Sequence, residues 1–146
     1  MREARGFTLI EVLIVVLVIS ILALITVPSL MGASRRGREA SLRADLRELR
    51  VAVEVFRAHT GVYPARLEDL IGDTAPANGL NDEGETASIE ANTYRGPYTR
   101  NPDGGLVKDP ITRAADWGYL TAPPSVGHVS SSAAGQTLEG VPYNNL

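Results

Sequence analysis

The chain has 146 residues with 44% apolar side chains, a composition that supports one folded domain plus an accessory segment and excludes a long disordered chain. Only 5% of the residues are aromatic, so a globular core must be small and mainly aliphatic. Cysteine is absent, which excludes disulfides, thiolate chemistry and cysteine-ligated zinc. The net charge of −3 is unevenly distributed: residues 1–34 are neutral, residues 35–57 carry seven arginines against four acids, and residues 66–146 carry five basic against eleven acidic side chains.

An uncharged segment of 23 residues lies between Glu11 and Arg35. As a helix it would extend about 34 Å, which is enough to cross a bilayer. Arg2 and Arg5 precede it and favour a cytoplasmic N-terminus, so we expect a single-pass membrane protein. A secretory signal peptide fits less well, because the apolar run exceeds the usual length and a carboxylate stands at its start.

A specific motif precedes the apolar segment, Arg5-Gly6-Phe7-Thr8-Leu9-Ile10-Glu11. Together with Pro28 inside the segment, it resembles the class III leader and N-terminal helix of type IV pilins and type II secretion pseudopilins. The resemblance implies that a membrane prepilin peptidase cuts after Gly6, removes residues 1–6 as a leader and methylates the new N-terminal residue, Phe7.

Two positions of this motif have a physical rationale. Gly6 has no side chain and therefore lets a peptidase approach the backbone closely. Glu11 lies four residues after Phe7, so its carboxylate would neutralise the Phe7 ammonium of the same or a neighbouring subunit and fix the subunit register. On spacing alone, extension of Glu11 to the lipid headgroups is an equally good interpretation, and the resemblance favours assembly.

Pro28 lacks an amide hydrogen and clashes with the carbonyl of Leu24, which predicts a helix kink or the end of the membrane span. Helical periodicity resumes beyond it on one apolar face: Leu42, Leu46, Leu49, Val53 and Phe56. The other side carries charged residues: Arg43, Arg47, Arg50, Glu54 and Arg57. We therefore predict one helix over residues 7–60, with a membrane-embedded first half and a second half that packs on a globular head; Gly61 and Pro64 end it.

The predicted head is small and rich in turns. Residues 63–71 are predicted to form a turn and a short helix, and residues 72–92 a polar, acidic loop. Residues 117–122 and 126–132 predict a β-hairpin. The fold class is thus α+β, with a long N-terminal helix packed on a small antiparallel β-sheet head, similar to type IV pilins; the aromatic residues expected in the core are Trp117, Tyr119 and Tyr143.

Short motifs in the C-terminal half are similar in order to those of major pseudopilins of type II secretion: Gly96-Pro97-Tyr98, Lys108-Asp109-Pro110, Trp117-Gly118-Tyr119, Gly127-His128-Val129 and Gly140-Val141-Pro142-Tyr143. Many members of that group hold a structural calcium through aspartates in the last loop. Here residues 135–146 contain one carboxylate, Glu139. We therefore assign no metal ligand and expect no cofactor.

Enzyme motifs are absent from the sequence, including G-x-S-x-G, H-E-x-x-H and the P-loop, so no catalytic residue is predicted. His59 and His128 are interpreted as structural or surface residues. No aromatic residue interleaves the arginine run before Phe56. This favours a solvated helix face that contacts the acidic bodies of neighbouring subunits over a nucleic-acid surface.

Two classes of function remain. The first is a structural subunit of a homo-oligomeric helical filament, polymerised from the bacterial inner membrane by an assembly platform with a cytoplasmic ATPase. The resemblance favours a type II secretion pseudopilus, with a type IV pilus for adhesion, motility or DNA uptake as the alternative. The second is a membrane-tethered binding domain, which needs neither Gly6-Phe7 nor Glu11. We expect residues 7–34 to form the membrane and filament-core half of the helix, and residues 35–146 to form a periplasmic or extracellular head.

Overall fold

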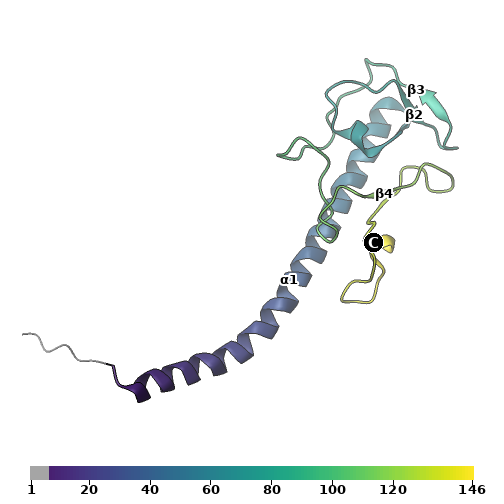
Figure 1. Cartoon of the computed structure of the whole chain (residues 1–146). Coiled ribbons are helices and arrows are strands. Elements are labelled where there is room, and N and C mark those ends of the chain that lie inside the picture. The colour runs from purple at the N-terminus through teal and green to yellow at the C-terminus, as the bar shows by residue number, and fades with distance from the viewer. Residues whose placement is uncertain (1–6) are drawn as a thin grey trace, which may run out of the picture. The chain divides into compact units, whose positions relative to one another are not determined.

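The computed structural model describes residues 7–146, of which residues 25–31 only by their backbone. One α-helix, α1, spans Leu9–Thr60 (Figure 1). It begins two residues later than predicted because Thr8 takes the N-cap position, where its carbonyl accepts a hydrogen bond from the Val12 amide at 3.3 Å. It ends where Gly61 adopts φ +81° and donates its amide to the carbonyl of Arg57 at 2.8 Å.

The chain divides into two compact units, residues 1–37 and residues 38–146. In the first unit α1 continues through Pro28, so this proline does not end the helix, and a kink there stays a prediction. Considering only the residues whose placement is described, no helix combines the length and apolarity needed to cross a membrane.

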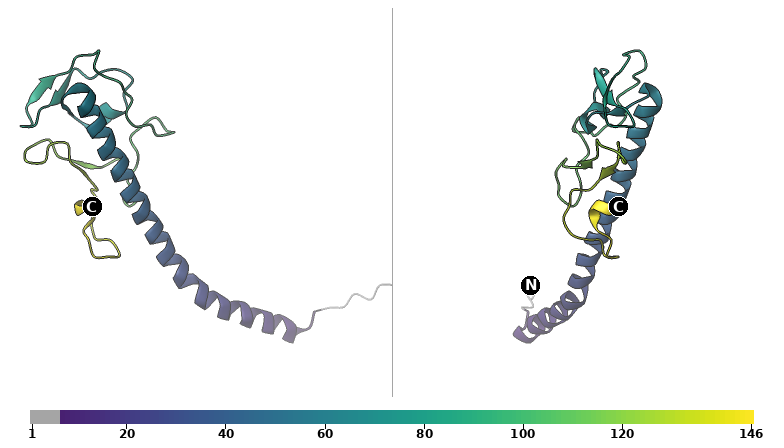
Figure 2. Two further views of the ribbon diagram at one scale, coloured as in Figure 1. Left: turned by 180° about the vertical axis from the view of Figure 1, so that it is seen from behind. Right: turned by 90° about the vertical axis from the view of Figure 1, so that its right-hand side faces the viewer.

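The second unit contains the C-terminal half of α1 and two small antiparallel sheets, which confirms the predicted α+β class. The three-stranded sheet has the order β1-β2-β3, and the two-stranded sheet pairs β4 with β5. The strands and loops lie along one side of the helix in this unit (Figure 2). In chain order the elements after α1 are β1 (Tyr63–Pro64), the 3-10 helix η1 (Leu67–Leu70), β2 (Asn78–Leu80), β3 (Thr86–Ser88), β4 (Gly118–Tyr119), β5 (Val129–Ser130) and the 3-10 helix η2 (Tyr143–Asn145).

The acidic segment 72–92 is not only a loop as predicted, because it contains β2 and β3. The hairpin depends on the chemistry of its turn. The side-chain oxygen Oδ1 of Asn81 accepts the amides of Glu83 at 3.1 Å and Glu85 at 2.7 Å. Gly84 has φ +77°, and a Cβ there would lie 2.5 Å from the carbonyl oxygen of Thr121. The two strands lack β-branched alternation, so the strand pattern gave no signal.

The hairpin predicted from residues 117–132 is present, with shorter strands than expected. Gly118 pairs with Ser130, and Tyr119 pairs with Val129. The amide of Leu120 continues the pairing by donating to the carbonyl of His128 at 3.0 Å. The two-residue strands show that this sheet is held mainly by what it packs against rather than by its own ladder.

The core is the predicted apolar face of α1 together with side chains from the head. The five helix residues named for this face are all at most 1% exposed. Trp117 and Tyr143 are buried against them, and Tyr119 is half-buried. The ring of Phe56 meets Tyr98 edge-on at a centroid distance of 5.3 Å and Tyr94 at 6.0 Å.

Candidate functional site

The first turns of α1 form an apolar surface that no other described residue of the chain covers. Phe7 is 80% exposed, Leu9 84% and Ile10 66%, and every described helix residue up to Leu24 is exposed. An open apolar groove of about 560 Å³ lies at the start of the helix, lined by Phe7, Thr8, Leu9, Val12, Leu13 and Val16. A helix that is apolar on all sides is stable only when lipid or other helices cover it.

Glu11 stands in the first turn of this apolar helix. Its amide donates to Oγ1 of Thr8 at 3.3 Å, so Thr8 is the N-cap and Glu11 the third helical residue. A carboxylate there is also stabilised by the positive end of the helix dipole. The spacing Thr8-x-x-Glu11 is that of a capping box, a sequence signal from which the role of Thr8 could have been predicted and was not.

The predicted site residues are only partly described. Gly6 and the rest of the predicted leader lie outside the described residues. Phe7 precedes the helix rather than forming part of it, so Phe7 and Glu11 flank the Thr8 cap at the same helix end. Pro28 lies well along α1, away from that end, and its side chain lies outside the description.

Three of the arginines beside the apolar face of α1 also contact the head of the same chain, which the sequence analysis did not predict. Arg43, Arg50 and Arg57 are seven residues apart and therefore follow one stripe beside the apolar face. Arg43 pairs with Glu139 at 3.0 Å, and Arg57 pairs with Asp82 at 2.6 Å. Arg50 donates to the carbonyl of Val129 at 2.8 and 3.0 Å and to that of Leu146.

A buried carboxylate extends this stripe towards the N-terminus. Glu39 is 3% exposed. Its carboxylate accepts the amide of Leu138 at 3.0 and 3.2 Å and the hydroxyl of Tyr143 at 3.1 Å. Glu39 therefore holds the last segment of the head against the helix, a role that sequence reasoning did not assign.

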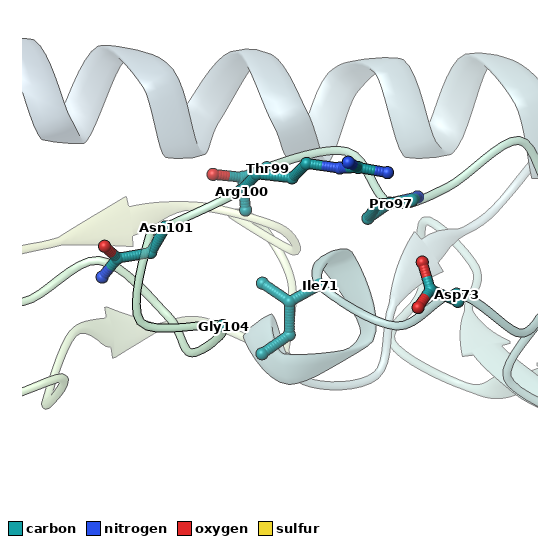
Figure 3. A pocket seen from close by; sticks show the side chains of 7 residues that line it. All are labelled: Ile71, Asp73, Pro97, Thr99, Arg100, Asn101 and Gly104. Carbon is teal, nitrogen blue, oxygen red and sulfur yellow. The ribbon is translucent and has the colours of Figure 1, made fainter.

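A small pocket of about 280 Å³ lies between the loop after η1 and the loop of residues 97–104 (Figure 3). Asp73 and Asn101 lie on either side of the Ile71 side chain in this view, and Arg100 extends along the pocket. These residues supply a carboxylate, a guanidinium and an amide, and Thr99, which also lines the pocket, donates its hydroxyl to the carboxylate of Glu48 at 2.8 Å.

The two histidines lie elsewhere, in structural surroundings. Nδ1 of His59 is 3.2 Å from the hydroxyl of Tyr98, and His128 is exposed beside β5. Within the described part of the chain, no three His, Cys, Asp or Glu side chains are close enough together to hold a metal ion.

Perturbed pKa values occur in the head and have local causes. Burial raises the pKa of Tyr119, whose hydroxyl donates to the carbonyl of Pro64 at 2.7 Å. The hydroxyl of Thr112, 2.6 Å away, lowers the pKa of Asp116. Burial raises the pKa of Asp45, against the lowering effect of its hydrogen bond from Ser41. The pKa of each of these three groups is thus shifted by burial or by a hydrogen bond within the head.

Comparisons with known proteins identify the family. The prokaryotic N-terminal methylation motif matches residues 1–27. The type II secretion system core protein G of Vibrio cholerae is 36% identical over 125 residues, which cover 83% of this chain and 73% of that protein. Its namesake from Klebsiella pneumoniae is 28% identical over 99% of this chain and 92% of its own length.

A pilus protein is similar as well. The type IV wide pilus major component PilA4 of Thermus thermophilus is 33% identical over 64% of this chain and 72% of its own length. No solved structure matches the chain significantly. The matched motif spans Phe7 and Glu11, and the similarity to the core G proteins extends through the head. The chain therefore belongs to the type IV pilin-like family that contains the type II secretion system core protein G.

Proposed function

We propose that this chain is a structural, non-enzymatic subunit of a helical filament, the pseudopilus of a type II secretion system. The observation that carries the proposal is the apolar helix of the first unit, exposed on all sides and bearing one carboxylate, Glu11, near its start. Bundling with copies of itself covers such a helix, and an open head-to-tail arrangement of identical contacts gives a filament. The names of the core G relatives support the assignment to secretion.

Glu11 is the assembly residue in this proposal. Around it Leu9, Ile10 and Val12 are each more than half exposed, so covering them in a bundle also removes water from the carboxylate. A desolvated carboxylate without a partner is costly. The ammonium that cleavage after Gly6 creates at Phe7 of a neighbouring subunit would neutralise it, and this pairing would fix the subunit register.

The same proposal covers processing and location. A prepilin peptidase removes residues 1–6 and methylates Phe7, consistent with the matched methylation motif. The subunit then resides in the bacterial inner membrane as a single-pass protein, with residues 7–34 as the anchor and residues 35–146 as a periplasmic head. An inner-membrane assembly platform transfers it to the filament.

A type IV pilus is the second candidate, favoured by the similarity to the wide pilus component of Thermus thermophilus. The two are distinguished by deleting the gene in its own host. Loss of protein secretion without loss of surface fibres supports the pseudopilus, whereas loss of surface fibres supports the pilus.

The test of the subunit role is electron microscopy of filaments sheared from cells that overproduce the full chain. Glu11→Ala should insert in the membrane, because the change makes the segment more apolar, and should abolish filaments. Glu11→Lys should be at least as harmful, since it places two cations together. Ser20→Ala is the matched control, because Ser20 is also exposed on this helix and its hydroxyl donates to the carbonyl of Val16 in the same helix at 2.7 Å. Normal filaments from Glu11→Ala would instead favour a membrane-tethered binding domain.

A further inference from the structure

One face of α1 in the head unit is uncovered. The strands and loops lie along one side of the helix (Figure 2). By helical periodicity Val51 and Val55 face away from the buried side, and they are 56% and 38% exposed. Arg47, one turn before Val51 on this side, is exposed, and within the described residues its guanidinium makes no hydrogen bond or ion pair. We define Arg47, Val51 and Val55 as the docking face.

A groove of about 320 Å³ adjoins the docking face, lined by Arg43, Leu46, Arg47, Arg50, Val51 and Leu146. Three of its six residues are arginines. Arg43 is engaged by Glu139, and Arg50 by two backbone carbonyls, so Arg47 supplies the unengaged positive charge. The chemistry that fits such a surface is a carboxylate next to an apolar side chain.

The same chain carries that combination in the turn of residues 82–85 between β2 and β3, which we define as the acidic turn. Glu83 is exposed there, and only its backbone amide is bonded within the described residues, to the side chain of Asn81. Gly84 packs against the backbone of Thr121. Leu120, the residue before Thr121, is 49% exposed. The acidic turn therefore presents a free carboxylate near an exposed apolar side chain.

The acidic turn does not reach Arg47 of its own chain. The ion pair between Arg57 and Asp82 shows that the turn lies beside residue 57, ten residues after Arg47, which corresponds to about 15 Å along the helix axis. Helical side chains also lean towards the helix N-terminus, so the guanidinium of Arg47 points away from the turn. A second copy displaced along the helix by about the same 15 Å brings its own acidic turn to Arg47.

We propose that the docking face binds the acidic turn of a second copy of this chain, with Arg47 paired to Glu83 of the neighbour. Because the two surfaces differ, the contact is head-to-tail and leaves one of each free at the ends. The displacement along the helix between copies keeps the repeat from closing into a ring. The charged pair sets the axial offset between copies, and the valines supply apolar contact with Leu120. This inference rests on the proposed function, since it assigns a contact within the proposed filament.

The test is cross-linking of the full chain in the cells that overproduce it. The protein has no cysteine, so introduced thiols have no background. A variant with both Arg47→Cys and Glu83→Cys, treated with a short bismaleimide, should give a ladder of covalent dimers and higher oligomers. Each single variant should give no such ladder. The matched control combines Arg47→Cys with Asp103→Cys, which is an exposed acid outside the acidic turn, and it should also give none.

Charge reversal gives a second readout that needs no cross-link. Arg47→Glu and Glu83→Arg should each lower the yield of sheared filaments by about tenfold, because like charges then meet at every contact. The combined variant should recover most of the yield, whereas Asp103→Arg should leave it unchanged. Filaments from the unmodified chain together with no ladder from the Arg47/Glu83 pair, or with equal ladders from the control pair, would overturn this inference alone. No filaments from the unmodified chain would overturn the proposed function as well.

Discussion

Removal of the Glu39 carboxylate should detach the last segment of the head from α1. In Glu39→Ala the amide of Leu138 and the hydroxyl of Tyr143 lose their acceptor. Hydrogen bonds to a charged group are worth about 1.5 to 3 kcal/mol each, and losing the buried carboxylate also removes its own desolvation cost. The two bonds together amount to about 3 to 6 kcal/mol. Because the desolvation cost is removed and Leu138 is partly exposed, so that its freed amide meets water, we expect a smaller loss of unfolding free energy, about 2 to 4 kcal/mol.

Urea unfolding of residues 34–146 measures this loss, and Trp117 is an internal fluorescence probe because it is the only tryptophan and lies in the core. At an m value of about 2 kcal/mol/M, the midpoint should fall by about 1 to 2 M. The matched control is Glu54→Ala, an exposed glutamate on the same helix, which should change stability by less than about 0.5 kcal/mol. Equal midpoints for the two variants would refute the assignment of Glu39 as the anchor of residues 137–143.

Three further predictions concern the core, a titration and processing. Phe56→Ala should destabilise residues 34–146 by about 3 to 5 kcal/mol, since the ring is fully buried between Tyr94 and Tyr98; an unchanged melting temperature would contradict this packing. Thr112→Ala should raise the pKa of Asp116 towards its ordinary value, because the hydrogen bond from the Thr112 hydroxyl is the main cause of the lowered pKa. The stabilisation by this hydrogen bond is present above the ordinary carboxylate pKa and is lost as the pH falls through the lowered pKa. An NMR titration measures the pKa and follows this pH dependence. Intact mass of membrane-extracted protein should correspond to a chain that begins at Phe7 and carries one added methyl group, and retention of residues 1–6 would exclude class III processing.

The apolar face of α1 could be predicted because its period of 3.6 residues depends only on local sequence. The same period also reaches Glu39, which lies three residues before Leu42 and continues the buried stripe by one turn. From the sequence alone, a glutamate at that position is expected to be exposed to solvent, because glutamate is rarely buried without a partner. The partners of Glu39 lie about one hundred residues later in the chain. The sequence pattern therefore predicted the apolar face of α1 but not the buried Glu39 at its N-terminal end.

The acceptors that the arginines contact could not be predicted for a related reason. Arg43, Arg47 and Arg57 are residues of the same type on one helix, and nothing in their local sequence tells them apart. Which of them finds an acceptor depends on where Asp82 and Glu139 lie, and those positions follow from turns such as Asn81 to Gly84. The strands of this hairpin are three residues long and have no alternation of apolar and polar residues, so their own sequence did not indicate strands.

The contacts between helix and head differ in what they contribute. The ion pairs of Arg43 and Arg57 are exposed, with side-chain exposures of 41% and 37% for the arginines and 73% and 65% for their partners. Pairs of this kind contribute about 0 to 1 kcal/mol, so they align the head along α1 rather than hold it there. The buried apolar face and the Glu39 carboxylate supply the stability. Because the stabilising contacts all use one side of α1, substitutions on the opposite side, at Arg47, Val51 or Val55, should alter association between chains without unfolding the head.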